Sequence, residues 1–439
     1  SVPCTWHKAM INEICRMSSG STPRRDNANN FNGTILWVSS GELKKKFVLD
    51  TNEKISQEAA RASHLKMYEP GAVVAAIYGL EAAGIRGTAS IIKKQCTISQ
   101  ACMAFTDFKG IDNEFFYYWY ILNGPRIGHR YAQGTKQQNL SSEIVGTLQI
   151  CFPPLPEQRK IAAILATQDK VIELKTKLLE ESKRRKKALM QRLLAPMGEK
   201  RLEAASPRGE AASCRFSAEW QIVRLSDLFL PVNRKNAKNN KNILTISAQD
   251  GLVSQMEYYK HQYASADTSG YTLLKEGEFA YNKSRAGEFP YGAIKMLKKY
   301  EEGVVSPIYL CFAAKKGVCQ DFWSYYFNGG MVNHGLYRIA QEGARNHGLL
   351  NIPTDEFFNL ELRVPPIAVQ RRIVAVLSTA DREIDLMEKE LNALELKKKA
   401  LMQLLLTGIV RVGEAASCRL ERAGNEAAGS RFSTRIAKV

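Results

Sequence analysis

The chain has 439 residues, of which 45% are hydrophobic and 24% charged, and its formal net charge is +18 at pH 7. This composition excludes a disordered polymer, and the length favours two or three globular domains over a single one. The excess of lysine and arginine favours a polyanionic partner, most commonly nucleic acid, although a basic protein without such a partner is the alternative.

Cysteine usage and hydropathy predict where the protein works. The chain has nine cysteines, an odd number, and no two of them form a CxxC pair. Residues 1–20 carry no secretory leader, and no apolar run reaches the ~18–20 residues that cross a bilayer. We therefore expect reduced thiols, a cytoplasmic location and no association with a membrane.

Residues 1–152 are predicted to form a first globular domain of mixed α/β structure. Short β-rich runs alternate with turn residues at 35–39, 72–79 and 89–94, and an aromatic helical stretch follows at 114–122. We expect the aromatic stretch to form core and not a platform for stacking bases. A loop near the start contains proline and two arginines, and its candidate phosphate contacts are Ser21, Thr22, Arg24 and Arg25.

A polar loop, residues 134–139, closes the first domain. Glutamine and asparagine can bind an adenine edge through two hydrogen bonds, and for this reason the loop is a candidate DNA contact. Its candidate residues are Thr135, Lys136, Gln137, Gln138 and Asn139. The alternative is a polar turn that only caps the next segment.

Residues 153–195 are predicted to form a long helix. The Pro-Pro pair at its start suits a helix N-terminus. Steps of four and three residues give a heptad seam, made of Ile161, Leu165, Gln168, Ile172, Lys175, Leu179, Ser182, Lys186, Leu189 and Leu193. Four of these positions are polar, so the seam would pack weakly by itself. The cationic run 183–187 is interpreted as a solvated face, with DNA-backbone contact or partner docking as alternatives.

A linker and a second mixed α/β domain follow. Residues 196–215 are rich in Ala, Glu, Gly and Ser, as linkers are, and residues 216–364 form the second domain. The latter has β-rich runs at 277–283 and 303–312 and an aromatic stretch at 321–327. Its candidate DNA contacts follow the first run and occupy the loop 343–348: Lys283, Ser284, Arg285, Arg345, Asn346 and His347.

Residues 365–408 repeat the first helix, and residues 409–439 form a tail. Pro153–Leu194 and Pro365–Leu406 align without a gap at an offset of 212, with 21 of 42 positions identical, as a duplication would produce. The repeat extends upstream, where Gly71 parallels Gly277 and Ser99–Phe105 parallels Ser306–Phe312. The second seam is mostly apolar: Ile373, Leu377, Ala380, Ile384, Met387, Leu391, Leu394, Lys398, Leu401 and Leu405.

The predicted fold class is therefore α+β, with two mixed α/β domains each followed by a long helix. We expect the two helices to pack on each other as an intramolecular antiparallel coiled coil with a pseudo-twofold arrangement, the apolar copy supporting the polar one. The alternative is that each helix packs only on its own domain.

The repeated combination of PPLPEQRKIAAIL and KKALMQRLL resembles the specificity subunit of type I restriction–modification systems. The GSTP element at Gly20–Pro23 and the loops GTKQQNLS and GARNHGLLNI fit the same family. The resemblance covers nearly the whole chain, although the second helix has Ala368-Val369-Gln370 where the first has Pro156-Glu157-Gln158. It implies that 1–152 and 216–364 are target-recognition domains, which read the two halves of a split asymmetric DNA sequence.

The resemblance also implies partners. These are double-stranded DNA, two modification (adenine methyltransferase) subunits docked on the helices, which also act as a spacer, and restriction (translocase and nuclease) subunits. S-adenosylmethionine, ATP and Mg²⁺ are expected on the partner subunits, and no cofactor is expected in this chain.

The sequence shows no catalytic motif, and we expect neither a catalytic residue nor a metal site. An amino-group methyltransferase needs a (D/N/S)PP(Y/F/W)-type motif, and the nearest match, Ser306–Tyr309 (SPIY), lacks the second proline. Its counterpart SQAC, Ser99–Cys102, suggests a shared structural strand. Walker loops, H-x-E and CxxC patterns are absent. Two alternatives stay open: a fused methyltransferase or nuclease, and a coiled-coil scaffold without DNA function.

Overall fold

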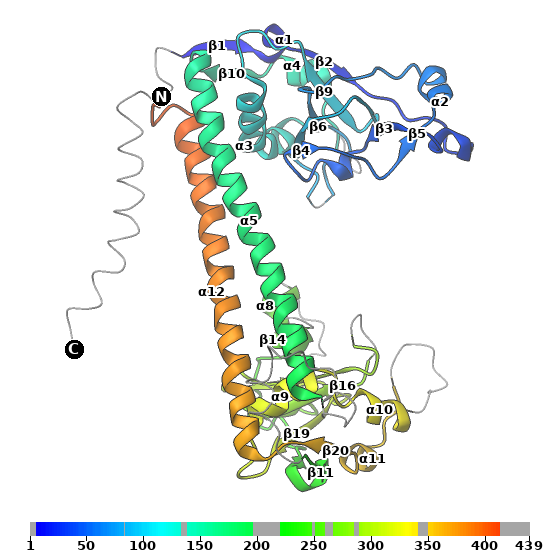
Figure 1. Ribbon diagram of the computed structural model, residues 1–439, viewed down its shortest axis with the longest axis vertical. Coiled ribbons are helices and arrows are strands. Elements are labelled where there is room, and N and C mark those ends of the chain that lie inside the picture. Colours follow the sequence, from blue (N-terminus) through cyan, green and yellow to red (C-terminus); the bar gives the residue numbers. More distant parts are fainter. Residues whose placement is uncertain are drawn as a thin grey trace, which may run out of the picture. The chain divides into compact units, whose positions relative to one another are not determined.

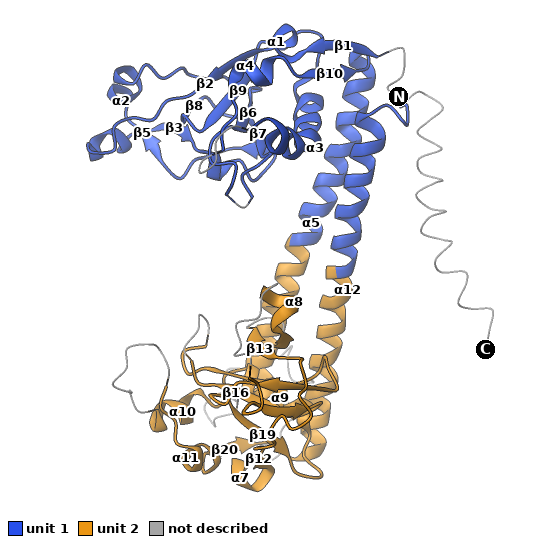
Figure 2. Cartoon of the chain, turned by 180° about the vertical axis from the view of Figure 1, so that it is seen from behind, with its two compact units in different colours: residues 1–176, 389–439 blue, residues 177–388 orange. Residues whose placement is uncertain are grey.

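The computed structural model describes residues 6–82, 84–132, 138–195, 220–247, 251–259, 267–284, 289–340 and 350–412. The chain divides into two compact units, one of residues 1–176 with 389–439 and one of residues 177–388 (Figure 2). Each unit holds one globular domain and a part of both long helices, α5 (Leu155–Leu194) and α12 (Ile367–Leu406). Within the described residues, no helix is both long and apolar enough to cross a membrane.

The first unit is built on a five-stranded sheet of order β2-β9-β6-β7-β4 (Figure 1). Its strands are β2 (Arg16–Ser19), β4 (Phe47–Val48), β6 (Val73–Ala76), β7 (Ala89–Ile92) and β9 (Cys102–Thr106). A three-stranded sheet contains β3 (Ile35–Val38), β5 (Lys54–Ile55) and β8 (Cys96–Ile98). The runs expected at 35–39, 72–79 and 89–94 therefore all contain strands.

Shorter elements complete the first domain. They are α1 (Ile11–Ile14), α2 (Gln57–Ala62), α4 (Ser142–Gly146) and two 3₁₀ turns, Ala28–Phe31 and Ser40–Glu42. β1 (His7–Met10) pairs antiparallel with β10 (Gln149–Phe152), and the chain passes from β10 into α5.

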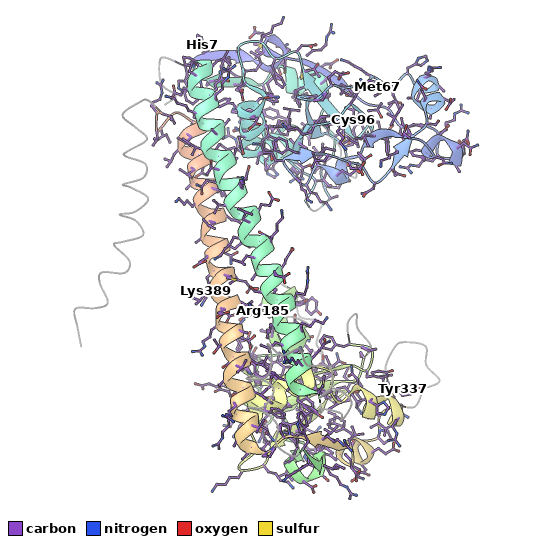
Figure 3. All side chains as sticks on the ribbon, in the orientation of Figure 1. His7, Met67, Cys96, Arg185, Tyr337 and Lys389 are labelled. Carbon is purple, nitrogen blue, oxygen red and sulfur yellow. The ribbon has the colours of Figure 1, made fainter. Side chains whose placement is uncertain are left out.

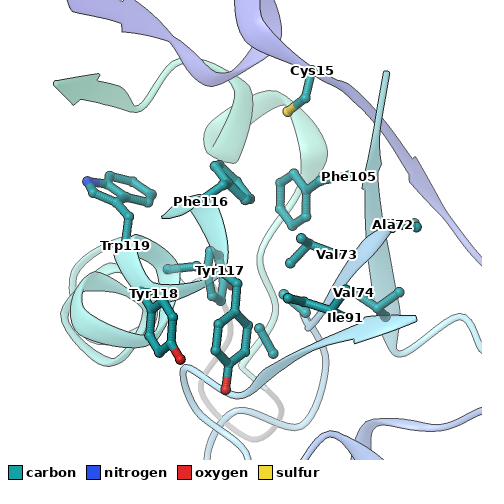
Figure 4. Packing of buried hydrophobic residues seen from close by; sticks show 14 of the residues in the cluster. Cys15, Ala72, Val73, Val74, Ile91, Phe105, Phe116, Tyr117, Tyr118 and Trp119 are labelled. Carbon is teal, nitrogen blue, oxygen red and sulfur yellow. The ribbon is translucent and has the colours of Figure 1, made fainter. Parts of the chain in front are cut away.

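The core of this domain lies between the sheet and the aromatic helix α3 (Asn113–Tyr131). The helix begins after Asp112, whose carboxylate accepts hydrogen bonds from the backbone N–H groups of Glu114 and Phe115. Figure 4 shows Phe116 of α3 beside Phe105 of the sheet, with Val73 of the same sheet nearby. The prediction that this stretch forms core is confirmed, since its aromatic side chains are buried.

The second unit has a four-stranded sheet of order β12-β19-β16-β17. Its strands are β12 (Phe229–Pro231), β16 (Phe279–Asn282), β17 (Ala293–Met296) and β19 (Leu310–Ala314). Three antiparallel pairs accompany it: β11 (Gln221–Arg224) with β20 (Glu361–Val364), β13 (Leu244–Ser247) with β14 (Gly251–Ser254), and β15 (Thr272–Lys275) with β18 (Glu302–Val305). The helices are α7 (Leu225–Leu228), α8 (Gln255–Tyr259), α9 (Gln320–Asn328), α10 (Asn333–Ile339) and α11 (Thr354–Phe358).

The sheet topology repeats the duplication that the sequence predicted. The order β2-β9-β6-β7 of the first unit recurs as β12-β19-β16-β17 in the second. Gly71 and Gly277 both adopt positive φ, 101° and 82°, just before equivalent strands. Two residues later, Val73 pairs with Phe105 and Phe279 pairs with Phe312, so the predicted upstream alignment is also correct.

One expectation about this segment is wrong. The run 303–312 is two strands, β18 and β19, separated by a turn in which the N–H of Tyr309 donates to the carbonyl oxygen of Ser306 over 3.0 Å. The counterpart in the first domain is also a turn, since Cys102 N–H donates to Ser99 O over 3.0 Å. SPIY and SQAC therefore share a turn and not a strand. Serine favours such a turn because its side chain competes with the backbone ladder.

The long helices pack on each other within each unit, and every predicted seam position is buried or half-buried. In the first unit Asp169 pairs with Lys398 over 2.5 Å, and Lys175 further along α5 pairs with Glu390 earlier on α12. In the second unit Lys183 pairs with Glu388 over 2.6 Å, and Lys186 pairs with Asp381. Residue numbers rise along one helix as they fall along the other, which confirms the antiparallel pairing.

These ion pairs also explain why a polar seam can pack. Lys186 and Lys398 are equivalent positions of the repeat, and so are Asp169 and Asp381. Each lysine pairs with the aspartate of the other copy, as two copies of one helix must do when they pair antiparallel. The seam lysines Lys175, Lys186 and Lys398 are thus neutralised by acidic groups of the opposite helix. Both helices also enter domain cores, so the alternative of separate packing describes only a part of their contacts.

The start of each helix is held by an equivalent glutamine. Gln158 Nε2 donates to Pro153 O over 2.7 Å, and Gln370 Nε2 donates to Pro365 O over 2.9 Å. The residue before each glutamine differs for a physical reason. Glu157 receives two hydrogen bonds from the Arg411 guanidinium, at 2.8 and 2.7 Å, whereas its counterpart Val369 is buried in the second core.

Replacing Glu157 by glutamine should lower stability in a way that depends on pH. The hydrogen bonds from Arg411 hold the pKa of Glu157 below its ordinary value of 4.5. The stabilisation is therefore fully present above pH 4.5 and is lost as the pH falls through the lower folded pKa. Because Arg411 is partly exposed, we expect a loss of about 1 kcal/mol at pH 7. Urea unfolding at pH 7 and at a series of pH values below 4.5 measures it, and a difference that does not shrink in acid would contradict this account.

Candidate nucleic-acid interface

The first group of candidate residues lies in the loop after β2, and the loop is held by the backbone of the sheet. Gly20 N–H donates to Cys102 O, and Ser21 N–H donates to Ile98 O, each over 3.2 Å. A Cβ atom on Gly20 would lie only 2.0 Å from Ile98 O. Only glycine fits this approach, which accounts for the first residue of the GSTP element.

The four candidate side chains of this loop differ in their exposure and in whether they already have partners. Arg25 is engaged, since its guanidinium donates two hydrogen bonds to Glu53 at 2.9 and 3.0 Å and lies 4.7 Å from the Phe31 ring centroid. Arg24 is exposed, whereas Ser21 and Thr22 are half-buried. The loop therefore offers Arg24 to a ligand and uses Arg25 to hold its own shape.

Replacing Gly20 by alanine should destabilise the first domain by about 2 kcal/mol, because a methyl group cannot enter the space next to a backbone carbonyl without a backbone shift. Thermal unfolding of the variant measures the effect. Gly41→Ala is the matched control, since the nearest atom to its Cβ would be 4.0 Å away. Equal melting temperatures for the two variants would show that the loop yields freely.

The second group in this domain lies where two loops meet. Gln138 and Asn139 are described, while Thr135, Lys136 and Gln137 lie outside the described residues. Leu80 N–H donates to Gln138 O over 3.1 Å, and Gln138 N–H donates to Glu81 Oε2 over 2.8 Å. The loop that follows β6 is therefore attached to the end of the candidate loop.

Arg86 joins the same junction, and sequence reasoning missed it. Its Nη2 donates to Gln138 Oε1 over 2.6 Å. The side chain also passes over α3 at Gly128, where an added Cβ would lie 2.7 Å from Arg86 Cγ. The backbones of Gly87 and Gly124 are also in close contact, since a Cβ built on Gly124 would lie 2.9 Å from Gly87 Cα. The small residues of the GPRIG segment could have indicated that a loop crosses the helix here.

The equivalent loops of the second domain also meet. Lys283 and Ser284 are described, while Arg285, Arg345, Asn346 and His347 lie outside the described residues. Leu350 N–H donates to Lys283 O over 3.0 Å, and Lys283 Nζ donates to Ile352 O over 3.1 Å. Burial lowers the pKa of Lys283. The structure thus attaches the end of the loop that contains Arg345 to the segment that begins at Lys283.

A basic loop that the sequence reasoning did not select follows β12. Residues 233–242 read NRKNAKNNKN, and their asparagine side chains bind within the loop. Asn236 Oδ1 accepts from the N–H of Asn240 over 2.7 Å, and Asn240 Oδ1 accepts from the N–H of Asn242 over 2.8 Å. Lys238 and Lys241 are exposed at the surface of this ordered loop. It occupies the same place after β12 that the loop of Arg24 occupies after β2.

The cationic run on α5 is partly used by the helix pair. Lys183 and Lys186 pair with acidic residues of α12, and Arg184 pairs with Glu181 over 3.2 Å. Arg185 is exposed on α5 and is labelled in Figure 3. Two residues of the run therefore pair with α12, while Lys183, Arg184, Arg185 and Lys187 are exposed, which agrees with a solvated face.

Among the described residues there is no group of three or more His, Cys, Asp and Glu side chains that could hold a metal ion. Burial raises the pKa of four thiols, Cys15, Cys96, Cys102 and Cys311, to about 12, so they are poor nucleophiles.

The sequence comparisons all match proteins or domains described as type I restriction specificity. A family profile described as "Type I restriction modification DNA specificity domain" matches residues 3–184. The specificity subunit of the type I restriction enzyme MjaVIII from Methanocaldococcus jannaschii is 21% identical over 454 residues, which cover 94% of this chain and 94% of that protein. The MjaIX specificity subunit of the same organism is 24% identical over 183 residues, 40% of each chain.

Two solved structures share the fold. The S subunit of a type I restriction–modification system from M. genitalium has a TM-score of 0.50 and 13% identity, with 92% of this chain and 96% of that chain covered. A chain from a structure on the complex assembly and conformational transition of a type I system has a TM-score of 0.55 and 16% identity, with 93% and 100% covered. Both likenesses concern the fold.

Proposed function

We propose that this chain is a specificity subunit of a type I restriction–modification system and that it reads a split, asymmetric DNA sequence. The target-recognition domains are residues 1–152 and 216–364, each followed by its long helix, 153–195 and 365–408. Residues 196–215 connect the two halves, and residues 409–439 follow the second helix. The family is non-catalytic, so chemistry belongs to the partner subunits.

The observation that carries this proposal is one sheet topology with two different sets of loops. The order β2-β9-β6-β7 recurs as β12-β19-β16-β17, and in both domains the loop after the third of these strands meets the polar segment before the helix. The loop residues themselves differ, with GTKQQN in one domain and GARNHG in the other. Two similar frames with different contact residues suit two different half-sites, and so a non-palindromic target.

The interface residues follow from these loops. In the first domain we propose Ser21, Thr22, Arg24, Arg25, Thr135, Lys136, Gln137, Gln138 and Asn139. In the second we propose Lys283, Ser284, Arg285, Arg345, Asn346 and His347. Arg25 and Gln138 would act through the loops that they hold, since both side chains already have partners.

The chain works inside a type I restriction–modification assembly. As finer proposals, the helix pair would act as spacer and hold two modification subunits, and restriction subunits would join that complex. S-adenosylmethionine would bind the modification subunits, and ATP and Mg²⁺ the restriction subunits. A cytoplasmic location, where host DNA is accessible, is part of the same proposal.

The test is adenine-methylation mapping of the host genome with and without this gene. We expect one split, non-palindromic motif to lose methylation when the gene is removed. An unchanged methylome in a host that expresses the modification subunit would contradict the proposal.

Two further measurements address the other functions. Specific binding of S-adenosylmethionine by the purified chain would indicate a fused methyltransferase. Equal retention of the mapped duplex and a scrambled duplex by the assembled complex would indicate a scaffold without DNA reading.

A further inference from the structure

A tyrosine of each globular domain donates a hydrogen bond to an aspartate of the long helix that follows the domain. In the first unit Tyr118 Oη lies 2.5 Å from Asp169 Oδ2. In the second unit Tyr325 Oη lies 2.5 Å from Asp381 Oδ2. The tyrosines occupy corresponding places in α3 and α9, and the aspartates are equivalent positions of the helix repeat. The same bond is therefore present in both copies.

Each aspartate also receives a lysine from the other long helix. Lys398 Nζ lies 2.5 Å from Asp169 Oδ1, and Lys186 pairs with Asp381. The side chains of Lys398 and Asp169 are only 23% and 24% exposed, so water screens their attraction weakly. One carboxylate thus joins three elements at a single point: the domain, its own helix and the paired helix.

A second cation approaches each tyrosine from the domain side. Lys46 Nζ donates to Tyr118 Oη over 3.0 Å and to Glu114 Oε2 over 2.8 Å. In the second unit Lys298 pairs with Asp321 over 2.9 Å and lies 5.9 Å from the Tyr325 ring centroid. Lys46 lies just before β4 and Lys298 just after β17, so these lysines have no common place in the repeat. Each domain therefore places a lysine near its tyrosine, but from a different position in the sequence.

The tyrosines stay donors under ordinary conditions. Burial raises the pKa of Tyr118, and the neighbouring Asp169 carboxylate raises it further. Burial and Asp381 do the same to the pKa of Tyr325. A neutral hydroxyl can donate to a carboxylate, and such charge-assisted hydrogen bonds are short and directional.

Apolar contacts make up much of the remaining packing between each domain and its helices. In the first unit Gln158, at the start of α5, also accepts a hydrogen bond from Asp112 N–H over 2.7 Å and donates one to Gly110 O over 3.1 Å. In the first unit Ile161 and Leu165 of α5 are fully buried in the core, and in the second unit Ile373 and Leu377 of α12 are buried in the same way. Apolar contacts are non-directional, so they hold a domain on its helices without fixing its rotation. The hydrogen bond from the tyrosine to the aspartate supplies a directional contact further along the helix, beyond the bonds of Gln158 at the start of α5.

We propose that Tyr118–Asp169–Lys398 and Tyr325–Asp381–Lys186 are positioning locks that fix the orientation of each recognition domain on its helix pair, and so make the spacer length of the DNA target strict. The proposal rests on the split-target function proposed above. Recognition of two half-sites depends on the distance and angle between their readers. A domain that can rotate on its helices reaches half-sites whose spacing differs by one base pair.

The test uses the chain assembled with its modification subunits and three duplexes with the mapped half-sites: the native spacer, one base pair more and one fewer. Tyr118→Phe and Tyr325→Phe each remove only a hydroxyl. We expect the ratio of the Kd for an altered spacer to the Kd for the native spacer to fall about tenfold, the equivalent of one charge-assisted hydrogen bond. The Kd for the native duplex should change by a smaller factor than this ratio does. Ratios equal to that of the unaltered chain would overturn the proposal.

Tyr68→Phe is the matched control in the first domain. Tyr68 Oη is hydrogen-bonded to Ser18 Oγ at 2.9 Å, inside the domain and without a long-helix partner, so the variant loses a similar bond. It should leave the spacer ratio unchanged, and a fall equal to that of Tyr118→Phe would show that destabilisation alone relaxes spacing. Should Tyr118→Phe not fold, Tyr325→Phe tests the second lock independently. Absence of duplex binding by the unaltered complex would instead refute the proposed function.

Discussion

Replacing Leu377 by alanine should lower the free energy of unfolding of the second unit by about 2–5 kcal/mol. This is the range for buried leucines whose removal leaves a cavity that the neighbouring side chains do not fill. Leu377 on α12 is fully buried in a cluster that includes Phe322, Trp323 and Leu194. The residue therefore belongs both to the domain core and to the helix pair. Its loss leaves a cavity at the place where the two meet.

Urea unfolding, combined with hydrogen exchange of the β19 amides, measures this loss within the second unit. Leu386→Ala is the matched control, since Leu386 lies on the same helix and is 59% exposed. We expect the control to change stability by less than about 0.5 kcal/mol. Similar losses for both variants would show that α12 contributes helix propensity and not core packing.

Replacing both Lys238 and Lys241 by glutamine should reduce the salt dependence of DNA binding. If both ammonium groups neutralise phosphates, the slope of log K against log salt becomes shallower by about 1.8, or 0.9 for each contact. Phosphate contacts carry no sequence information, so the affinities for cognate and scrambled duplexes should fall by the same factor. Fluorescence anisotropy of the assembled complex at several salt concentrations measures both quantities.

Lys316→Gln provides the control for charge alone. Lys316 is exposed just beyond the end of β19, whereas the basic loop leaves β12 beside the start of that strand. Removing this lysine should leave the slope unchanged, because it lies at the other end of the strand pair. A fall in cognate affinity alone, after the double replacement, would assign the two lysines to bases instead of phosphates.

The sequence predicted the features that repeat or have a period. The heptad seam placed each position from Ile161 to Leu193 on one face of α5, and the structure buries or half-buries all of them. The aromatic stretches were correctly assigned to the core, because consecutive large rings in a helix have no other place to avoid water. The offset of 212 predicted the equivalence of Asp169 and Asp381 before their partners were known.

Contacts between distant segments could not be predicted in the same way. Nothing local to Arg25 indicates Glu53 as its partner, and nothing local to Tyr118 indicates Asp169. The order of the strands depends on such long-range pairing, and the composition of the β-rich run 303–312 does not separate one strand from two strands joined by a turn. The candidate DNA contacts were chosen by residue chemistry alone, so neither Arg86 nor the ordered loop of Lys238 was found.

The discontinuity of the first unit has a consequence for synthesis on the ribosome. Its core includes Met402, Leu405, Leu406 and Val412, which are translated after the whole second unit, and that unit is one continuous stretch, 177–388. The first domain to be translated is therefore the last whose core is complete. Until α12 emerges, Ile161 and Leu165 lack part of their apolar surroundings, and the nascent chain exposes a surface that chaperones bind.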